Sequence, residues 1–454
     1  MTRFKHIPAI LFCGFLLLSL LPGCGEKQPL SVWVSVATIV DGRAEAFANK
    51  AVYHLKKLDE SFEAEITVFQ EELQEGQEAA GYAETQTLLS SLLAGEGPDV
   101  IIFTDYDFGD VRKLAESGVF LDLSHYLAES DTISEGDFVP GVFTSCKVND
   151  MYYYLPLGFN VLGAVTSREI LSLYGWDTPE DIGDLLMQID AFSAEEQSGT
   201  VFFNGFPEYE AVRDYPLRWL VQYSGIRLID YDTGAVLPDE EALYRIISTY
   251  QKIWLQQREA EFLDGTLLAE GLLQRRELCF LYPYLNVSLI GRSVLSGDVA
   301  PEMQCLGGLD GSVVASISAY VAINANCQSP ESAWRLIEMM LGKPMQDSIL
   351  TGYDTTMDIP IRLGCLNDYW PEYRDYFANT YFVDSNGGNH FPEELDSETA
   401  ERYAARCESA VACYNSQTAL DMMMDSMTPY LAGETEYETC LEQLRNRLTL
   451  YAGE

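Results

Sequence analysis

Short apolar strands alternate with amphipathic helices after the N-terminal segment, and this alternation limits the possible folds more than any other feature. Residues 99–103, Asp-Val-Ile-Ile-Phe, form a continuous apolar run, which is typical of a strand in a sheet that is covered on both faces. Residues 31–35 and 66–69 have strand patterns, whereas 43–59 and 84–94 have apolar residues at helical spacing. This repeated strand–helix order predicts an α/β lobe with a largely parallel sheet.

The rest of the chain continues this order with more helix. Thr178 followed by Pro179 predicts a helix that begins there, with threonine as the N-cap. Beyond residue 360 the chain is acidic and rich in tyrosine, and we expect it to be mainly helical. The other predicted strands are 152–157, 161–166, 278–285 and 318–323, and the other predicted helices are 167–173, 239–255, 329–341, 395–428 and 436–451.

The N-terminus has the pattern of an export signal. Two basic residues precede the apolar run 7–21, which is shorter than the ~20 residues of a membrane-spanning helix. The run ends in Leu-Pro-Gly-Cys at 21–24, which resembles the lipobox of bacterial lipoproteins. That resemblance implies a lipoprotein signal peptide at 1–23 and a lipid-anchored tether at 24–30, with lipid on the thiol of Cys24. The protein would then lie on the extracytoplasmic face of a bacterial cell membrane; an uncleaved anchor or an ordinary secretory signal is the alternative.

The charge of the chain excludes some partners. There are 28 Lys and Arg residues against 70 Asp and Glu, which gives a formal net charge of −42. Binding to nucleic acid or to anionic lipid needs clustered basic residues, so neither is expected. The acidic excess predicts a solvated acidic surface or, alternatively, a field that attracts a cationic ligand.

No motif in the sequence indicates catalysis, a metal or a cofactor. The chain has no HExxH, GxSxG, P-loop or GxGxxG pattern, and no pair of carboxylates is marked out for glycoside hydrolysis. Asp230, Asp232 and Asp239 lack the spacing of an EF-hand. Eight cysteines follow Cys24 and none forms CxxC, so disulfides and buried free thiols both remain open, and we favour free thiols.

Seven segments have a familiar order and spacing along the chain: 88–101, 118–123, 149–156, 166–180, 229–238, 319–341 and 357–360. Together they resemble the extracellular solute-binding proteins of ABC importers, in the maltose-binding-protein-like branch (family 1). The resemblance covers roughly residues 31–365, and the C-terminal part matches loosely. At 275–280 the sequence Arg-Arg-Glu-Leu-Cys-Phe departs from the Gly-Lys-Ala-Ala-Met that the family usually has.

This resemblance implies a two-lobed periplasmic-binding-protein-like α/β fold, with a helical C-terminal region and a ligand cleft between hinged lobes. Lobe 1 would comprise 31–150 and 288–350, and lobe 2 would comprise 151–287 and 351–454. The closed form would deliver a small solute, most simply a carbohydrate, to the transmembrane subunits of an ABC permease. The implied protein is not an enzyme. A cationic or peptide-like solute, or a surface adhesion or assembly role without transport, is the alternative.

The candidate ligand contacts follow strands or lie near the hinge, because ligands of open α/β sheets bind beyond the carboxyl ends of strands. Aromatic rings would stack on a sugar while Asp and Asn accept its hydroxyl groups. Packing in the core or a surface turn is the alternative at each position. The candidates are Asp105, Tyr106 and Asp107 after the strand 99–104, Phe159 and Asn160 near the hinge, Trp219 on a helix, Tyr282 and Tyr284 on both sides of Pro283, and Tyr320 on a strand.

Overall fold

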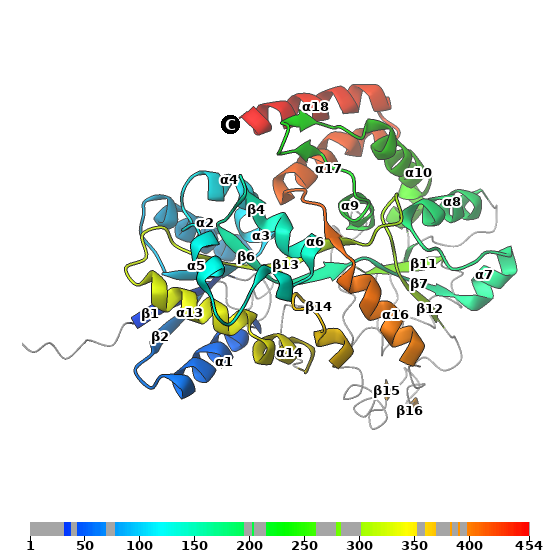
Figure 1. Cartoon of the computed structure of the whole chain (residues 1–454). Helices are drawn as coiled ribbons and strands as arrows, with labels where there is room; N and C mark the ends of the chain where they lie inside the picture. Colours follow the sequence, from blue (N-terminus) through cyan, green and yellow to red (C-terminus); the bar gives the residue numbers. More distant parts are fainter. Residues whose placement is uncertain are drawn as a thin grey trace, which may run out of the picture.

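The protein consists of two groups of elements, each with its own sheet, shown at the left and right of Figure 1. In the computed structural model the described residues are 31–37, 43–69, 78–194, 202–203, 215–259, 278–282, 301–351, 359–368, 382–383, 389–390 and 397–453. The predicted signal and tether, with Cys24, and the candidate Tyr284 lie outside the described residues. None of the described helices is both long and apolar enough to cross a membrane.

The larger sheet has the order β14-β6-β13-β3-β1-β2, and β17 pairs with the start of β13. Strand β1 pairs in parallel with β2 and β3, but β13 is antiparallel to both β3 and β6. The predicted parallel pairing is confirmed for β1, β2 and β3, but the whole sheet is mixed because β13 runs antiparallel between β3 and β6. The strands are β1 (Ser31–Ala37), β2 (Glu63–Phe69), β3 (Val100–Phe103), β6 (Tyr154–Val161), β13 (Val314–Ile323), β14 (Ile359–Pro360) and β17 (Val411–Ala412).

The smaller sheet has the order β12-β7-β11-β8. Strand β7 is antiparallel to its two neighbours, and β11 pairs in parallel with β8. Its strands are β7 (Gly163–Ser167), β8 (Phe202–Phe203), β11 (Cys279–Tyr282) and β12 (Pro301–Cys305). The two-residue strands outside both sheets are β4 (Lys147–Val148), β5 (Met151–Tyr152), β9 (Ile229–Asp230), β10 (Ala235–Val236), β15 (Phe382–Val383) and β16 (Asn389–His390).

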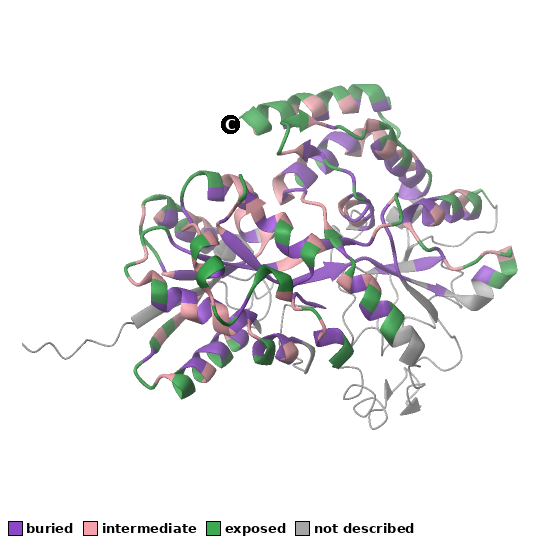
Figure 2. Cartoon of the chain, viewed as in Figure 1, coloured by how far each residue is buried: buried purple, intermediate pink, exposed green. Residues whose placement is uncertain are grey.

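Helices cover both sheets and enclose two separate hydrophobic cores, seen as buried strands and helix faces in Figure 2. The first core lies around the larger sheet, and the second lies between the smaller sheet and the C-terminal helices. The helices are α1 (Arg43–Leu58), α2 (Glu78–Leu93), α3 (Asp105–Phe108), α4 (Val111–Glu116), α5 (Ser124–Glu129), α6 (Pro140–Phe143), α7 (Arg168–Tyr174), α8 (Ile182–Ser193), α9 (Tyr215–Gln222), α10 (Glu240–Glu259), α13 (Pro330–Leu341), α14 (Lys343–Thr351), α16 (Ser397–Glu408), α17 (Gln417–Leu431) and α18 (Tyr437–Gly453), with 3-10 turns at η2 (Glu135–Asp137) and η3 (Thr144–Cys146).

The chain passes between the two cores three times, and we call these passages the crossing segments. They lie at 161–162, 306–313 and 410–419, where core residues change from one cluster to the other. The predicted lobe boundary at residue 150 falls before β6, which packs in the first core because it pairs with β13. Residues 359–410, predicted for lobe 2, also supply first-core residues such as Ile359 and Cys407. The exact division into lobes remains a proposal.

Two helix predictions were wrong: one helix begins later than predicted, and the other is divided in two. Helix α8 begins at Ile182, and its N-cap is Asp181, whose carboxylate accepts from the Asp184 backbone N–H at 2.8 Å. Residues 180–182 instead bond to Gly307 through backbone groups, which keeps them extended and outweighs the local Thr-Pro signal. The single helix predicted at 395–428 is two helices, α16 and α17, because β17 between them joins the sheet.

All eight cysteines after Cys24 lie in described parts of the chain. They are free thiols and six of them are buried, as favoured from the sequence. These side chains therefore contribute to packing in the same way as small apolar residues.

Candidate functional site

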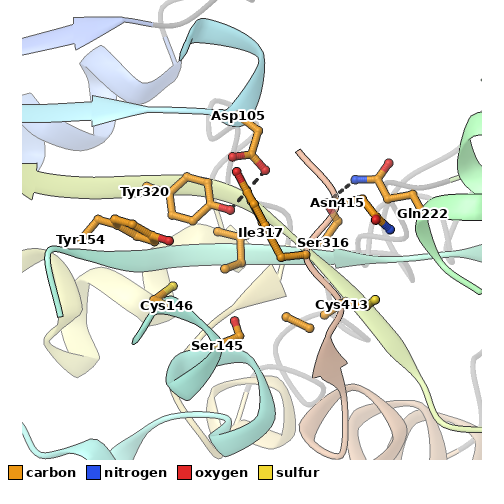
Figure 3. Close-up of a pocket in the computed structure, with 13 residues that line it drawn as sticks. Asp105, Ser145, Cys146, Tyr154, Gln222, Ser316, Ile317, Tyr320, Cys413 and Asn415 are labelled. Carbon is orange, nitrogen blue, oxygen red and sulfur yellow. Dashed lines mark hydrogen bonds between the residues drawn. The ribbon is translucent and has the colours of Figure 1, made fainter. Parts of the chain in front are cut away.

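A small cavity lies where the crossing segments meet. Its polar wall is built from both halves of the molecule, as Figure 3 shows. The polar residues that the argument uses are Asp105, Tyr154, Gln222, Ser316, Tyr320 and Asn415.

The register of the larger sheet brings Asp105 and Tyr320 together. Tyr320 pairs with Phe103 at the carboxyl end of β3, and Asp105 follows that end by two residues. The Tyr320 hydroxyl donates to Asp105 Oδ2 at 3.3 Å (Figure 3). Tyr154 of β6 stands edge-on to the Tyr320 ring, with centroids 5.2 Å apart and an interplanar angle of 88°. Two predicted contact residues therefore share one wall of the cavity.

The carboxyl group of Asp105 is poorly compensated. Its Oδ1 atom is buried and has no hydrogen-bond partner among the described residues. Burial, together with the nearby Asp110 carboxylate, raises the pKa of Asp105 to about 8, although the Tyr320 hydroxyl acts in the opposite direction. None of the described residues that line the cavity is Lys or Arg. The cavity therefore contains an acceptor that no protein cation in this lining balances.

Asp107 has a local structural role instead. Its Oδ2 atom accepts from the Thr104 backbone N–H at 2.6 Å and from the Thr104 hydroxyl at 3.0 Å, which fixes the first turn of α3. Burial raises the pKa of Asp107 to about 7 despite these two hydrogen bonds. Asp107 is not part of the cavity lining described above.

The second half of the molecule closes the other side of the cavity. Gln222, at the end of α9, donates from Nε2 to the Ser316 hydroxyl of β13 at 2.7 Å (Figure 3). Asn415 accepts from the Leu228 backbone N–H at 2.8 Å and donates to the Ile226 carbonyl at 2.9 Å. These bonds tie the third crossing segment to the second core, so a movement of the lobes would change the shape of the cavity.

A second polar cluster joins the lobes beside the cavity, around the buried carboxylate of Asp110. This carboxylate accepts hydroxyl bonds from Tyr231 at 2.9 Å, Tyr414 at 3.1 Å and Tyr451 at 2.6 Å. It also caps α4 by accepting from the Lys113 backbone N–H at 3.2 Å. Asp110 precedes a first-core helix, whereas Tyr231 and Tyr451 pack against the second core. We call these residues the Asp110 cluster; no sequence pattern had indicated it.

Close approach of the two halves also depends on Gly109. Its φ of +74° ends α3, and a Cβ there would lie 2.8 Å from the Thr418 hydroxyl at the start of α17. The sequence Asp-Phe-Gly-Asp at 107–110 therefore serves both the helix end and the contact between lobes.

The other predicted contacts are scattered. Phe159 is fully buried in the first core. Asn160 is buried, in register with Ser316 of the cavity wall, and its Oδ1 has no hydrogen-bond partner within the described parts of the chain. Trp219 is partly buried against the second core. Tyr106 lies on α3 and Tyr282 on β11, at positions where the backbone alone is described. All nine candidates remain proposals as ligand contacts.

The fold shows the structural class to which the chain is similar. The chain has the two-lobed fold of the maltose-binding-protein-like extracellular solute-binding proteins, as the resemblance predicted. The sugar-binding protein MalE of Xanthomonas citri has a TM-score of 0.65 at 15% identity, over 93% of this chain and 98% of that one. No protein-family profile and no curated protein matches the sequence, so the relationship rests on structure.

Two further solved proteins show the same likeness. The cyclic α-maltosyl-1,6-maltose binding protein of Arthrobacter globiformis has a TM-score of 0.60 at 14% identity, over 93% of this chain and 99% of that one. A family 1 extracellular solute-binding protein of Alicyclobacillus acidocaldarius has a TM-score of 0.58 at 11% identity, over 95% of this chain and 100% of that one.

Proposed function

We propose that the protein is an extracytoplasmic solute receptor of an ABC importer and binds a carbohydrate between its lobes. The observation that carries the proposal is a cavity at the crossing segments whose polar wall comes from both halves of a two-lobed fold. A solute that touches both halves stabilises their closed arrangement, which is how a hinge couples binding to shape. The neighbours that are named as sugar-binding proteins support a carbohydrate as the solute.

The same proposal places the protein on the membrane through lipid on Cys24 and gives it a permease as partner. The receptor has no enzymatic step in this scheme. Metabolic labelling with a radioactive fatty acid tests the anchor: label should enter the wild-type protein and be lost from Cys24→Ala. Label retained by the variant would contradict lipidation at this cysteine.

Ligand-induced thermal stabilisation tests the binding function. A solute that binds only the folded protein stabilises it by ~2.7 kcal/mol at one hundred times its Kd. We expect a shift in melting temperature with at least one compound in a screen of mono- and oligosaccharides. If no sugar shifts the transition, the carbohydrate receptor proposal fails, and a protein with an assembly or adhesion role is favoured.

A further inference from the structure

The cavity contains a buried carboxyl group that has no positive partner in the lining. Asp105 Oδ1 is buried and unpartnered among the described residues, and Oδ2 has one long hydrogen bond, from Tyr320 at 3.3 Å. The charged groups that act on Asp105 are the carboxylates of Asp107 and Asp110, whereas the nearest cation, Arg112, acts on the neighbouring Cys146 and Tyr154. A buried carboxylate in such surroundings is costly unless a cation or strong donor reaches it.

Aromatic rings stand beside this carboxylate. The Tyr320 ring stacks on Phe103 at 5.5 Å, and Tyr154 meets Tyr320 edge-on. Rings of this kind attract an alkylammonium group through the negative potential of their faces. Hydrogen-bonding side chains lie elsewhere in the same cavity, on Gln222 and Ser316, which are bonded to each other.

We propose that the solute carries a protonated amino group that pairs with Asp105 beside Tyr154 and Tyr320, so that the substrate class is an amino sugar. This inference rests on the proposed carbohydrate receptor and adds the charge of the ligand. A neutral hydroxyl could hydrogen-bond to the protonated carboxyl, but it would not favour the ionised form. An ammonium group supplies both the donor and the balancing charge, and such charge-assisted bonds are about twice as strong as neutral ones.

Proton linkage gives the pairing a signature. The raised pKa of Asp105, about 8, means that the carboxyl holds a proton at pH 6–7 until an ammonium group displaces it. The affinity for an amine that stays protonated should therefore rise with pH, by up to ~tenfold in Kd per unit below pH 8. Asp107, with a pKa of about 7, acts in the same direction. The other groups around Asp105 are Asp110, the Arg112 guanidinium, which acts on Cys146 and Tyr154, and the buried Cys146, Tyr154, Tyr320 and Tyr414. Burial raises the pKa of the thiol and of these three tyrosines, which keeps them neutral in this range.

Calorimetric titration of the purified protein tests the inference. The probes are glucosamine and its short β-1,4 oligomers, each compared with the N-acetylated and the neutral glucose counterpart. We expect the aminated probe to bind at least ten times more tightly than its neutral counterparts and more tightly at pH 7 than at pH 6. Asp105→Asn should weaken its binding by thirtyfold or more and reduce the pH dependence to the part that Asp107 contributes. Asp131→Asn, which removes an exposed carboxylate away from the cavity, should change neither.

The outcomes separate the two proposals. Equal binding of aminated and neutral sugars, or full binding by a folded Asp105→Asn variant, would refute the amino-group inference and leave the carbohydrate receptor intact. If neither kind of sugar binds, the proposed function itself fails and the inference fails with it. Binding of putrescine but of no sugar, lost in Asp105→Asn, would keep the ammonium site and overturn the sugar.

Discussion

Replacing Asp110 with alanine should destabilise the protein more than any nearby surface change. Asp110 is 5% exposed and accepts bonds from three tyrosine hydroxyls and one helix N–H. Bonds to a charged acceptor contribute ~1.5–3 kcal/mol each, but the three share one carboxylate and do not add. Removing one partner of a buried charged network costs ~3–5 kcal/mol, so we expect about 4 kcal/mol for Asp110→Ala.

Calorimetry and urea unfolding measure this change. An unfolding entropy of ~2.1 cal/mol/K per residue gives about 1 kcal/mol/K for 454 residues, so the melting temperature should fall by about 4 °C if the chain unfolds as one unit. Tyr451→Phe removes one of the three hydroxyls and should cost about 1–2 kcal/mol. Asp232→Ala is the matched control, because this carboxylate is 68% exposed in its pair with Arg112 and should cost less than ~1 kcal/mol. A loss below 1 kcal/mol in Asp110→Ala would refute the reasoning that this cluster holds the lobes together.

Three other outcomes follow from the structure. Between pH 4 and 8 the folded state keeps the Asp105 proton that the unfolded chain releases, so the free energy of unfolding falls as pH rises, by at most ~1.4 kcal/mol per pH unit. Asp105→Asn should remove that part of the slope when urea unfolding is measured at several pH values. An unchanged slope would contradict this prediction. Gly141→Ala places a Cβ 2.5 Å from the Ala410 carbonyl oxygen and should lower the free energy of unfolding by ~1–3 kcal/mol in the same assay. Unchanged stability would contradict this prediction and would show that α6 can shift. Burial raises the pKa of the half-buried thiols of Cys327 and Cys413 to about 12 and 11. A thiol reagent at pH 8 should therefore label these cysteines slowly in the native protein and at once in the unfolded protein. Fast labelling of the native protein would contradict this prediction.

Part of the site could be predicted from the sequence because its residues lie next to recognisable local patterns. Asp105 follows an uninterrupted apolar strand, and Tyr320 lies on a strand with similar character. Both therefore belong to a central sheet, and a strand end at the lobe junction is a predictable place for a ligand group. The two-lobed α/β fold was predicted in the same way, from the strand–helix order and from the segments that resemble the solute-binding proteins.

The remaining features depend on contacts between distant parts of the chain. Tyr414 and Asn415 lie beside a two-residue strand, β17, that is formed only because β13 offers it a partner. A strand of two residues is too short to show a residue periodicity, so the sequence predicts one continuous helix over 395–428. The Thr178 N-cap failed for a related reason: backbone bonds to Gly307 decide where α8 begins.

The place of β13 in the larger sheet also affects how the protein is made. Strand β13 lies between β3 and β6, yet it follows β3 by roughly 200 residues. At ~5–20 residues per second of synthesis, β3 has no partner on that side for roughly 10–40 s. An apolar strand with an open edge can pair with another chain during this interval. The first sheet can therefore close only after more than two thirds of the chain has emerged, so this edge is open to wrong pairing throughout that interval.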